Sequence, residues 1–308
     1  MNKEEFVLEL KKIGIEPRIE MLDKAEFKTV VSSEFNRFDF HLKDVWSYKD
    51  LIGLFVKRDF TSKYKQTILG PAWAVIQPLL TTIVFTFIFG NIAGLADCGA
   101  VPSFLFYMLG NILWGYFSGC LTGTSSTFIA NAGIMGKVYY PRLVMPISTV
   151  LTNLISFAIQ FVMFVVFMLF MMFVPDYQMQ PNLLILMLPV IILEMAMLGL
   201  GFGIIAASMT TKYRDLNMLI GFGVQLWMYG TPIAYSISIF EKSPIIYKLI
   251  NINPMTPIVQ IMRYAFLGEQ AAEINWTYYG ISWIITLCVL FIGIFMFNKV
   301  ERTFMDTV

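Results

Sequence analysis

One acidic residue, Glu194, lies inside a long apolar segment of this sequence, at about residues 183–208. Ionisable groups in such segments are costly, and they usually face a bundle interior or a wet cavity. Glu194 could therefore contact a transported substrate or a gate. It could instead form a hydrogen bond to a neighbouring helix as the neutral acid, and a location at the membrane interface also stays open.

A second candidate site is the basic run at residues 48–67, which mixes apolar side chains with cations. The apolar members are Leu51, Leu54, Phe55 and Phe60, and the cations are Lys57, Arg58, Lys63 and Lys65. This composition is typical of an amphipathic helix that lies on a membrane with its basic groups at the lipid headgroups. The same cations could collect the pyrophosphate of a lipid-linked substrate, but composition alone favours headgroup binding.

Aromatic residues are frequent in the first three apolar segments. Candidates for lining a channel, together with Glu194, are Trp73, Phe85, Phe89, Trp114 and Tyr116. A lining of this kind would stack on sugar rings. Trp and Tyr also form anchoring belts at membrane interfaces, and for any single aromatic residue we favour packing or anchoring.

Motifs of catalysis do not occur in the sequence. The nearest approach to a Walker A motif, residues 133–138, lacks the upstream glycine and the Ser or Thr after the lysine. A nucleophile elbow, HExxH and CxxC are missing too, and one histidine with three scattered cysteines fits neither a metal site nor a disulfide framework. We therefore expect no catalytic residue, metal or cofactor in this chain. If transport is driven by ATP, the ATP and Mg²⁺ bind a separate partner.

The elements that must position these residues are membrane helices. Hydrophobic residues make up 57% of the chain and charged residues 14%, whereas soluble proteins carry about 25% charged residues. A span needs about 20 apolar residues to cross a bilayer core of about 30 Å. Six segments qualify, at approximately 71–94, 103–130, 143–174, 183–208, 216–236 and 277–298. The expected fold is all-α and polytopic, with a permease domain at 71–300.

The orientation follows from lysine and arginine. With six spans, 19 of the 22 Lys and Arg residues lie on the side of the N-terminus, which the positive-inside rule places in the cytoplasm. The first fifty residues lack the apolar core of a signal peptide. We therefore expect a plasma-membrane protein with both termini cytoplasmic. Its further parts are an extension at 1–47, an interface helix with its loop at 48–70, and a tail at 301–308.

The segment 236–276 is apolar but contains prolines and charges, so it does not read as a span. We predict two short helices, at about 243–252 and 256–267, that dip into the outer leaflet. Non-helical backbone at that depth is tolerated where protein or water satisfies it.

Five stretches, in order, resemble the type-2 ATP-binding-cassette exporters that move polysaccharides, above all the O-antigen and teichoic-acid permeases. They are VKRDFTSKYKQTILGPAWAVIQPLLTTIVFTFIFG (56–90), NAGIMGKVYYPRLVMP (131–146), LGLGFGIIAASMTTKYRDL (198–216), TPIAYS (231–236) and NINPMTPIVQIMRYAFLG (251–268). The resemblance covers about residues 48–300. Residues 1–45 are longer than the usual N-terminal arm of that family, so no role carries over to them.

The resemblance implies roles for individual residues. By it, residues 48–67 match a cytoplasmic interface helix, and Leu69 and Gly70 match its loop into the first span, which is linked to substrate entry. We assign substrate entry to Lys57, Arg58, Lys63, Tyr64, Lys65, Leu69 and Gly70. Contact with the ATPase is implied for Lys137, Tyr140, Arg142, Tyr213, Arg214 and Asp215, for which positive-inside anchoring is the alternative. An outer gate is implied for Tyr235, Asn253, Pro254 and Arg263, within residues 237–268 and the turn before them.

The resemblance also implies a homodimer with two copies of a separate ATPase. Six spans can hardly enclose a pore for a polymer, whereas a two-fold dimer can. The expected function is export of a lipid-linked polysaccharide, O-antigen-like or teichoic-acid-like, with membrane lipids and no nucleic acid as further partners. A drug or small lipid as cargo stays open. A membrane-embedded glycosyltransferase would need clustered catalytic carboxylates or histidines, and a proton-coupled carrier would need more intramembrane charge.

Overall fold

The computed structural model describes residues 42–65, 67–96, 99–135, 140–210, 213 and 215–307, without the side chains of 42–44, 132, 135 and 298–307. All of them belong to one compact unit that runs from Phe40 to Val308. Every regular element in these ranges is a helix. The prediction of an all-α fold is therefore confirmed for the part of the chain that the structure describes.

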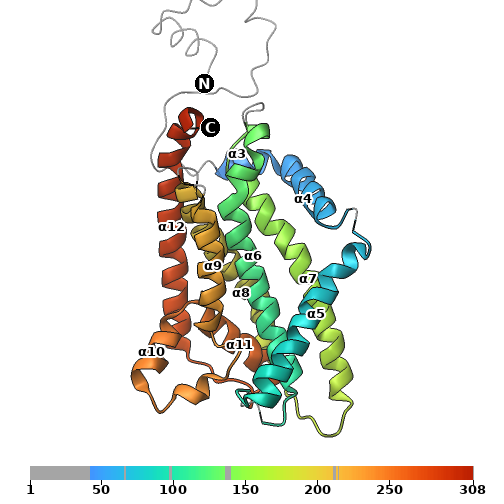
Figure 1. The fold of residues 1–308 in the computed structure, drawn as a ribbon. Helices are drawn as coiled ribbons and strands as arrows, with labels where there is room; N and C mark the ends of the chain where they lie inside the picture. The colour runs from blue at the N-terminus through green and yellow to red at the C-terminus, as the bar shows by residue number, and fades with distance from the viewer. Residues whose placement is uncertain are drawn as a thin grey trace, which may run out of the picture. The chain divides into compact units, whose positions relative to one another are not determined.

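The helices follow one another along the chain as Figure 1 shows. The α-helices are α3 (Leu42–Ser47), α4 (Lys49–Tyr64), α5 (Trp73–Phe85), α6 (Ser103–Met135), α7 (Val144–Met172), α8 (Leu188–Thr210), α9 (Leu216–Tyr229), α10 (Pro244–Ile252), α11 (Met255–Leu267) and α12 (Trp276–Thr307). Shorter 3₁₀ segments are Gly70–Ala72, Leu183–Met187 and Ile237–Phe240, and Thr86–Ile92 is a π-helix that continues α5.

Five helical segments among the described residues are long and apolar enough to cross a membrane. They are Gly70–Ile92, Ser103–Asn131, Val144–Met172, Leu183–Thr210 and Trp276–Phe297. These five correspond to the first four predicted spans and the sixth, and they make the chain a multi-pass membrane protein.

The fifth predicted span, residues 216–236, is only partly helical. α9 ends at Tyr229, because Pro232 lacks an amide proton and disfavours helical backbone in the residue before it. A helix of 14 residues is about 21 Å long, which is short of a bilayer core of about 30 Å. In Figure 1, α9 nevertheless runs along the bundle between its two ends, and it contacts α6 and α8.

α8 lies at the centre of the bundle, between α6 and α12. A Cβ atom on Gly203 would lie 2.5 Å from the Cβ of Thr124 on α6, and one on Gly201 would lie 3.0 Å from the Cα of Leu290 on α12. Gly199 and Gly203 have the four-residue spacing of small residues that lets membrane helices approach closely. Glycine on both sides of α8 therefore sets the spacing of three spans.

The two short helices predicted near the outer face are present as α10 and α11, but their environments differ. α10 exposes apolar side chains, among them Ile245 and Leu249. α11 is buried along nearly its whole length against α6, α8 and α12. The apolar residues of α11 therefore pack in the protein core, and the depth of the two helices in the outer leaflet stays a prediction.

Candidate functional site

The polar groups and the charges named in the sequence gather at two ends of the bundle. α3, α4 and the later part of α12 lie at one end, and α10 lies at the other (Figure 1). We call them the α4 end and the α10 end.

The α4 end has its own apolar cluster, which docks α4 on the spans. The ring of Phe55 is 4% exposed and lies 5.8 Å from that of Tyr140, between centroids. Phe128 of α6 and Phe297 of α12 pair beside it at 5.4 Å. Leu54, expected among the apolar contacts, is exposed instead. α4 thus packs by one face, chiefly against α7.

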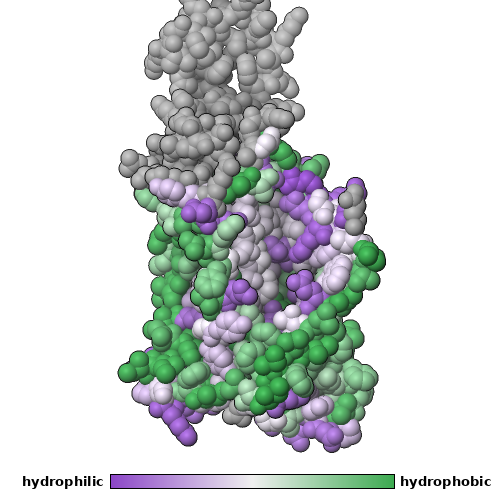
Figure 2. Space-filling view, viewed as in Figure 1, coloured by the Kyte–Doolittle hydropathy of each residue, from purple (hydrophilic) through white to green (hydrophobic). Residues whose placement is uncertain are grey.

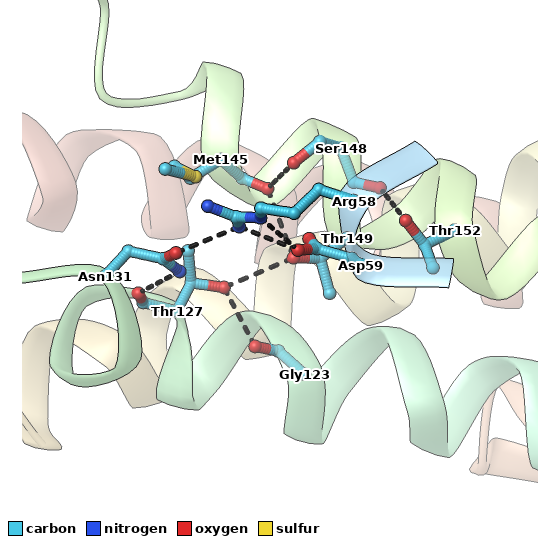
Figure 3. A network of polar contacts seen from close by, with 9 residues as sticks. All are labelled: Arg58, Asp59, Gly123, Thr127, Asn131, Met145, Ser148, Thr149 and Thr152. Atoms are coloured by element: carbon cyan, nitrogen blue, oxygen red, sulfur yellow. Dashed lines mark hydrogen bonds and ion pairs between the residues drawn. The ribbon is translucent and has the colours of Figure 1, made fainter. Parts of the chain in front are cut away.

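Arg58 on this helix holds α4 to α6, as Figure 3 shows. Its side chain is 32% exposed and lies 2.7 Å from Asp59 Oδ1. Its Nη2 also donates to Asn131 Oδ1 of α6 at 3.0 Å, and the guanidinium carbon lies 4.8 Å from the centroid of Phe55. Asn131 Nδ2 in turn donates to the carbonyl of Thr127 at 2.9 Å. Arg58 therefore connects two elements.

The same network continues into the neighbouring helices. The hydroxyls of Thr127 and Thr149 lie 3.4 Å apart and join α6 to α7 (Figure 3). At the end of α8, the hydroxyl of Thr210 donates to the Ser125 carbonyl of α6 at 3.0 Å. Ser125 Oγ donates at 3.3 Å to Asn217 Oδ1 of α9. Neutral polar residues thus join α6 to three helices at this level.

The other members of the predicted capture site lie apart from this network. Lys57, Lys63 and Lys65 are exposed, and the Lys63 amine lies 5.7 Å from the ring centroid of Tyr64. Tyr64 itself is buried. Leu69 is exposed, and Gly70 has a φ of 52°, a left-handed conformation that favours glycine. The three lysines are thus exposed, whereas the arginine binds α6.

The described residues among those expected to contact an ATPase lie at the same end. Tyr140 is buried against Phe55, and burial raises the pKa of its hydroxyl while Arg58 and Arg142 oppose the rise. Tyr213 and Asp215 are exposed next to the start of α9. Lys137 and Arg214 lie outside the described residues, as does the extension up to residue 41.

Most of the aromatic channel candidates lie inside this one chain. Trp114 is buried between Phe117 and Trp227, with ring centroids at 5.3 and 6.2 Å. Tyr116 is buried with its ring 5.2 Å from Phe157, and Phe85 and Phe89 are half-buried, 5.0 Å from each other. Only Trp73 among the five is well exposed, at 42%.

A polar strip lies between the two ends. In Figure 2, hydrophilic and neutral residues gather over α6, flanked by apolar surface. α6 contributes the small residues Gly115, Ser118, Gly119 and Thr122. Exposed amides accompany them on α5 and α9, at Gln77 and Gln225. These two helices, with the π-helix that continues α5, also expose apolar residues, namely Leu80, Ile83, Val84, Phe87, Met218, Leu219, Phe222 and Leu226.

At the α10 end, side chains satisfy the backbone where α9 stops. Arg263 of α11 is fully buried, lies 3.5 Å from the ring centroid of Phe106, and donates to the carbonyls of Pro232 and Ile233. Asn253 donates to the Gly230 carbonyl at 3.1 Å. Two of the predicted gate residues therefore bind backbone carbonyls of the same turn, at residues 230–233.

The remaining gate residues adjoin this turn. The Tyr235 hydroxyl donates to the Tyr229 carbonyl at 3.2 Å. The carbonyl of Pro254 accepts from Ser282 of α12 at 2.9 Å, and Ser282 also lies 2.6 Å from the fully buried carboxyl of Glu194. Glu194, expected to line a channel, thus lies beside the gate residues and inside the bundle.

Two of the residues that organise these ends, Asn131 and Ser282, were missed by the sequence reading. Both are neutral and lie in helices that are otherwise mostly apolar. The available signal was a polar side chain within a predicted span for Ser282 and just after one for Asn131, and it does not say which way that side chain faces.

The sequence profile of the ABC-2 type transporters matches residues 50–267. The chain belongs to the ABC-2 type transporter family. Two relatives of this ABC-2 type transporter are O-antigen export system permease proteins RfbA of Klebsiella pneumoniae, 27% and 28% identical over 259 residues. Each alignment covers 83% of this chain and 94% of the relative. A protein of the same description from Myxococcus xanthus is 25% identical over 233 residues, 75% of this chain and 86% of its own.

Proposed function

We propose that this chain is the membrane permease subunit of an ATP-binding-cassette exporter that moves an O-antigen-like, lipid-linked polysaccharide out of the cytoplasm. The observation that carries the proposal is the family match over residues 50–267, joined to relatives described as O-antigen export permeases and aligned over most of their length. Its multi-pass helical structure fits a transport subunit. The chain itself has no Walker A motif, so a separate subunit hydrolyses ATP, with Mg²⁺, for it.

The topology has six crossings, with α9 as the fifth and both termini in the cytoplasm. Two observations support it. α9 runs between the two ends of the bundle (Figure 1), and six crossings place 19 of the 22 Lys and Arg residues on one side. The α4 end is then cytoplasmic and the α10 end faces outward.

The ATPase binds at the α4 end, on α4 and the loop that leads to α7. Arg58 binds α6 and Phe55 packs against Tyr140, so a movement of α4 also moves the spanning helices. The exposed Tyr213 and Asp215 offer further contacts on the same side. By the resemblance, Lys137, Arg142 and Arg214 belong to this surface.

Two copies of the chain form the channel. A polar strip such as that on α6 is costly against lipid, and apolar faces of α5 and α9 flank it. A second copy related by two-fold symmetry would cover the apolar faces and enclose the strip. The hydroxyl and amide groups of the strip match the hydroxyl-rich surface of a glycan.

The lipid pyrophosphate is captured at the α4 end by Lys57, Lys63 and Lys65. All three are exposed, whereas Arg58 already binds Asp59 and Asn131. The loop through Leu69 and Gly70 leads from these lysines into the first span. In this arrangement the lysines bind the pyrophosphate, and Arg58 anchors α4 to α6.

The experiment is reconstitution of the purified chain with a candidate partner ATPase from the same organism, in liposomes that contain lipid-linked O-polysaccharide. We expect ATP-dependent appearance of the glycan on the opposite face, and none with an ATPase whose Walker A lysine is replaced. A complex that moves a drug or a small lipid but no glycan would assign a different cargo. Absence of any ATPase complex would refute the exporter.

A further inference from the structure

The carboxyl of Glu194 lies in a fully buried position between α8 and α12. Its hydrogen-bond partner among the described residues is Ser282, whose Oγ is 2.6 Å from Glu194 Oε1, and Tyr279 lies nearby, one turn earlier on α12. Both neighbours are neutral and carry a hydroxyl. An ionised carboxylate held by neutral groups alone in an apolar bundle is costly.

The hydrogens of this site can be counted. Ser282 Oγ lies within hydrogen-bond distance of two oxygens, Glu194 Oε1 at 2.6 Å and the Pro254 carbonyl at 2.9 Å. A serine hydroxyl has one hydrogen to donate, and a carbonyl oxygen only accepts. If Glu194 were ionised, it would also only accept, and one of the two contacts would have no hydrogen.

We infer that Glu194 is a neutral carboxylic acid that donates to Ser282 Oγ, while Ser282 donates to the carbonyl of Pro254. This pair of consecutive hydrogen bonds, which we call the Glu194 relay, has one hydrogen for each contact. The short 2.6 Å distance lies within the range of O–H···O hydrogen bonds. Glu194 is thus an intramolecular hydrogen-bond donor and not a residue that contacts the transported substrate.

The relay fixes the junction of α10 and α11, which begins the buried helix of the outer end. Pro254 immediately precedes α11, and Asn253 beside it binds Gly230 and Thr231 in the turn after α9. The junction is therefore held from α12 and α8 on one side and from α9 on the other. Glu194 is a positioning residue of the exit. That exit role rests on the proposed function, whereas the relay itself does not.

The protonation state is tested on the full chain in nanodiscs by infrared spectroscopy, comparing the wild type with Glu194→Gln at neutral pH. We expect the wild type to show a protonated-carboxyl C=O band that the variant lacks. A difference spectrum that shows the loss of an ionised carboxylate overturns the inference. This measurement needs neither an ATPase nor a substrate.

The positioning role is tested in the reconstituted complex. Glu194→Gln keeps a donor for Ser282 and should retain transport, whereas Glu194→Leu and Ser282→Ala should lower it about tenfold, the effect expected when one buried hydrogen bond is lost. Thr286→Val is the matched control, because it removes another buried hydroxyl from α12 and should leave transport unchanged.

Glu194→Gln as impaired as Glu194→Leu would overturn the role, and so would full activity of Ser282→Ala. If Glu194→Leu does not fold, Ser282→Ala and Thr286→Val decide between the outcomes. A wild-type complex that moves no glycan refutes the proposed function, and the infrared band then decides the relay alone.

Discussion

Replacement of Gly203 by alanine should separate α6 from α8. The new Cβ would lie 2.5 Å from the Cβ of Thr124 and 3.0 Å from the carbonyl oxygen of Leu121. Carbon atoms in contact prefer about 3.5–4.0 Å, so the helices must move apart by about 1 Å. Thr124 is fully buried and the Leu121 atom is backbone, so neither can rotate away.

The size of the effect follows from these contacts. Overpacking of a core costs about 1–3 kcal/mol, and the backbone contact favours the upper half of that range. Alanine gains about 1 kcal/mol over glycine as a helix former, which offsets part of the cost. We therefore expect Gly203→Ala to destabilise the chain by about 1–2 kcal/mol. The assay is thermal unfolding in detergent, where the midpoint should fall by a few degrees.

Gly280→Ala is the matched control, because Gly280 also lies in a spanning helix but has nothing within 4 Å of the added Cβ. We expect the same midpoint as the wild type or a higher one. If Gly203→Ala unfolds at the wild-type temperature as well, the close approach of α6 and α8 is refuted.

Three further predictions concern the two ends of the bundle. Arg58→Ala should lower the maximal transport rate, because it frees α4 from Asn131. Lys57→Ala should instead raise the substrate concentration at half-maximal transport. If the two variants change the same kinetic parameter, Arg58 and Lys57 do not have separate roles. Arg263→Met should lower the unfolding midpoint strongly, because buried carbonyls lose their donor at about 1–3 kcal/mol each. Arg263→Lys, without the planar fork, should fall between Arg263→Met and the wild type, and a midpoint equal to that of the wild type in both variants would argue against the clamp. Asn253→Ala should speed hydrogen exchange in the turn at 230–236, and unchanged exchange would show that this turn is held by other contacts.

The spans could be predicted from the sequence because their signal is local. A long apolar run at the right length fixes a membrane helix almost alone, and five of the six predictions found such a helix. The fifth run, 216–236, is also largely apolar, but its helix stops before Pro232 and its carbonyls are taken up by Arg263 and Asn253 from other segments. Hydropathy does not register where such partners come from.

The candidate sites could be predicted only in part, for a related reason. Rare charges inside or beside apolar segments mark Arg58, Glu194 and Arg263 in the sequence. Their partners are neutral residues or backbone carbonyls, such as Asn131 and Ser282. Which neutral residue meets a charge depends on how each helix is rotated, and the rotation is set by close packing at sites such as Gly203. That information is not local.

The placement of the aromatic residues favours a passage between two copies over a passage through one chain. Trp114 and Tyr116 fill the interior of the bundle with tilted, closely packed rings, so a polymer could pass there only if the core came apart. The strip over α6 needs no such opening, because its small residues are already exposed or half-exposed. The two ends are tied by side-chain clamps, with Arg58 at one and Arg263 at the other. Each copy would then move largely as a unit, and the channel would widen where two copies meet.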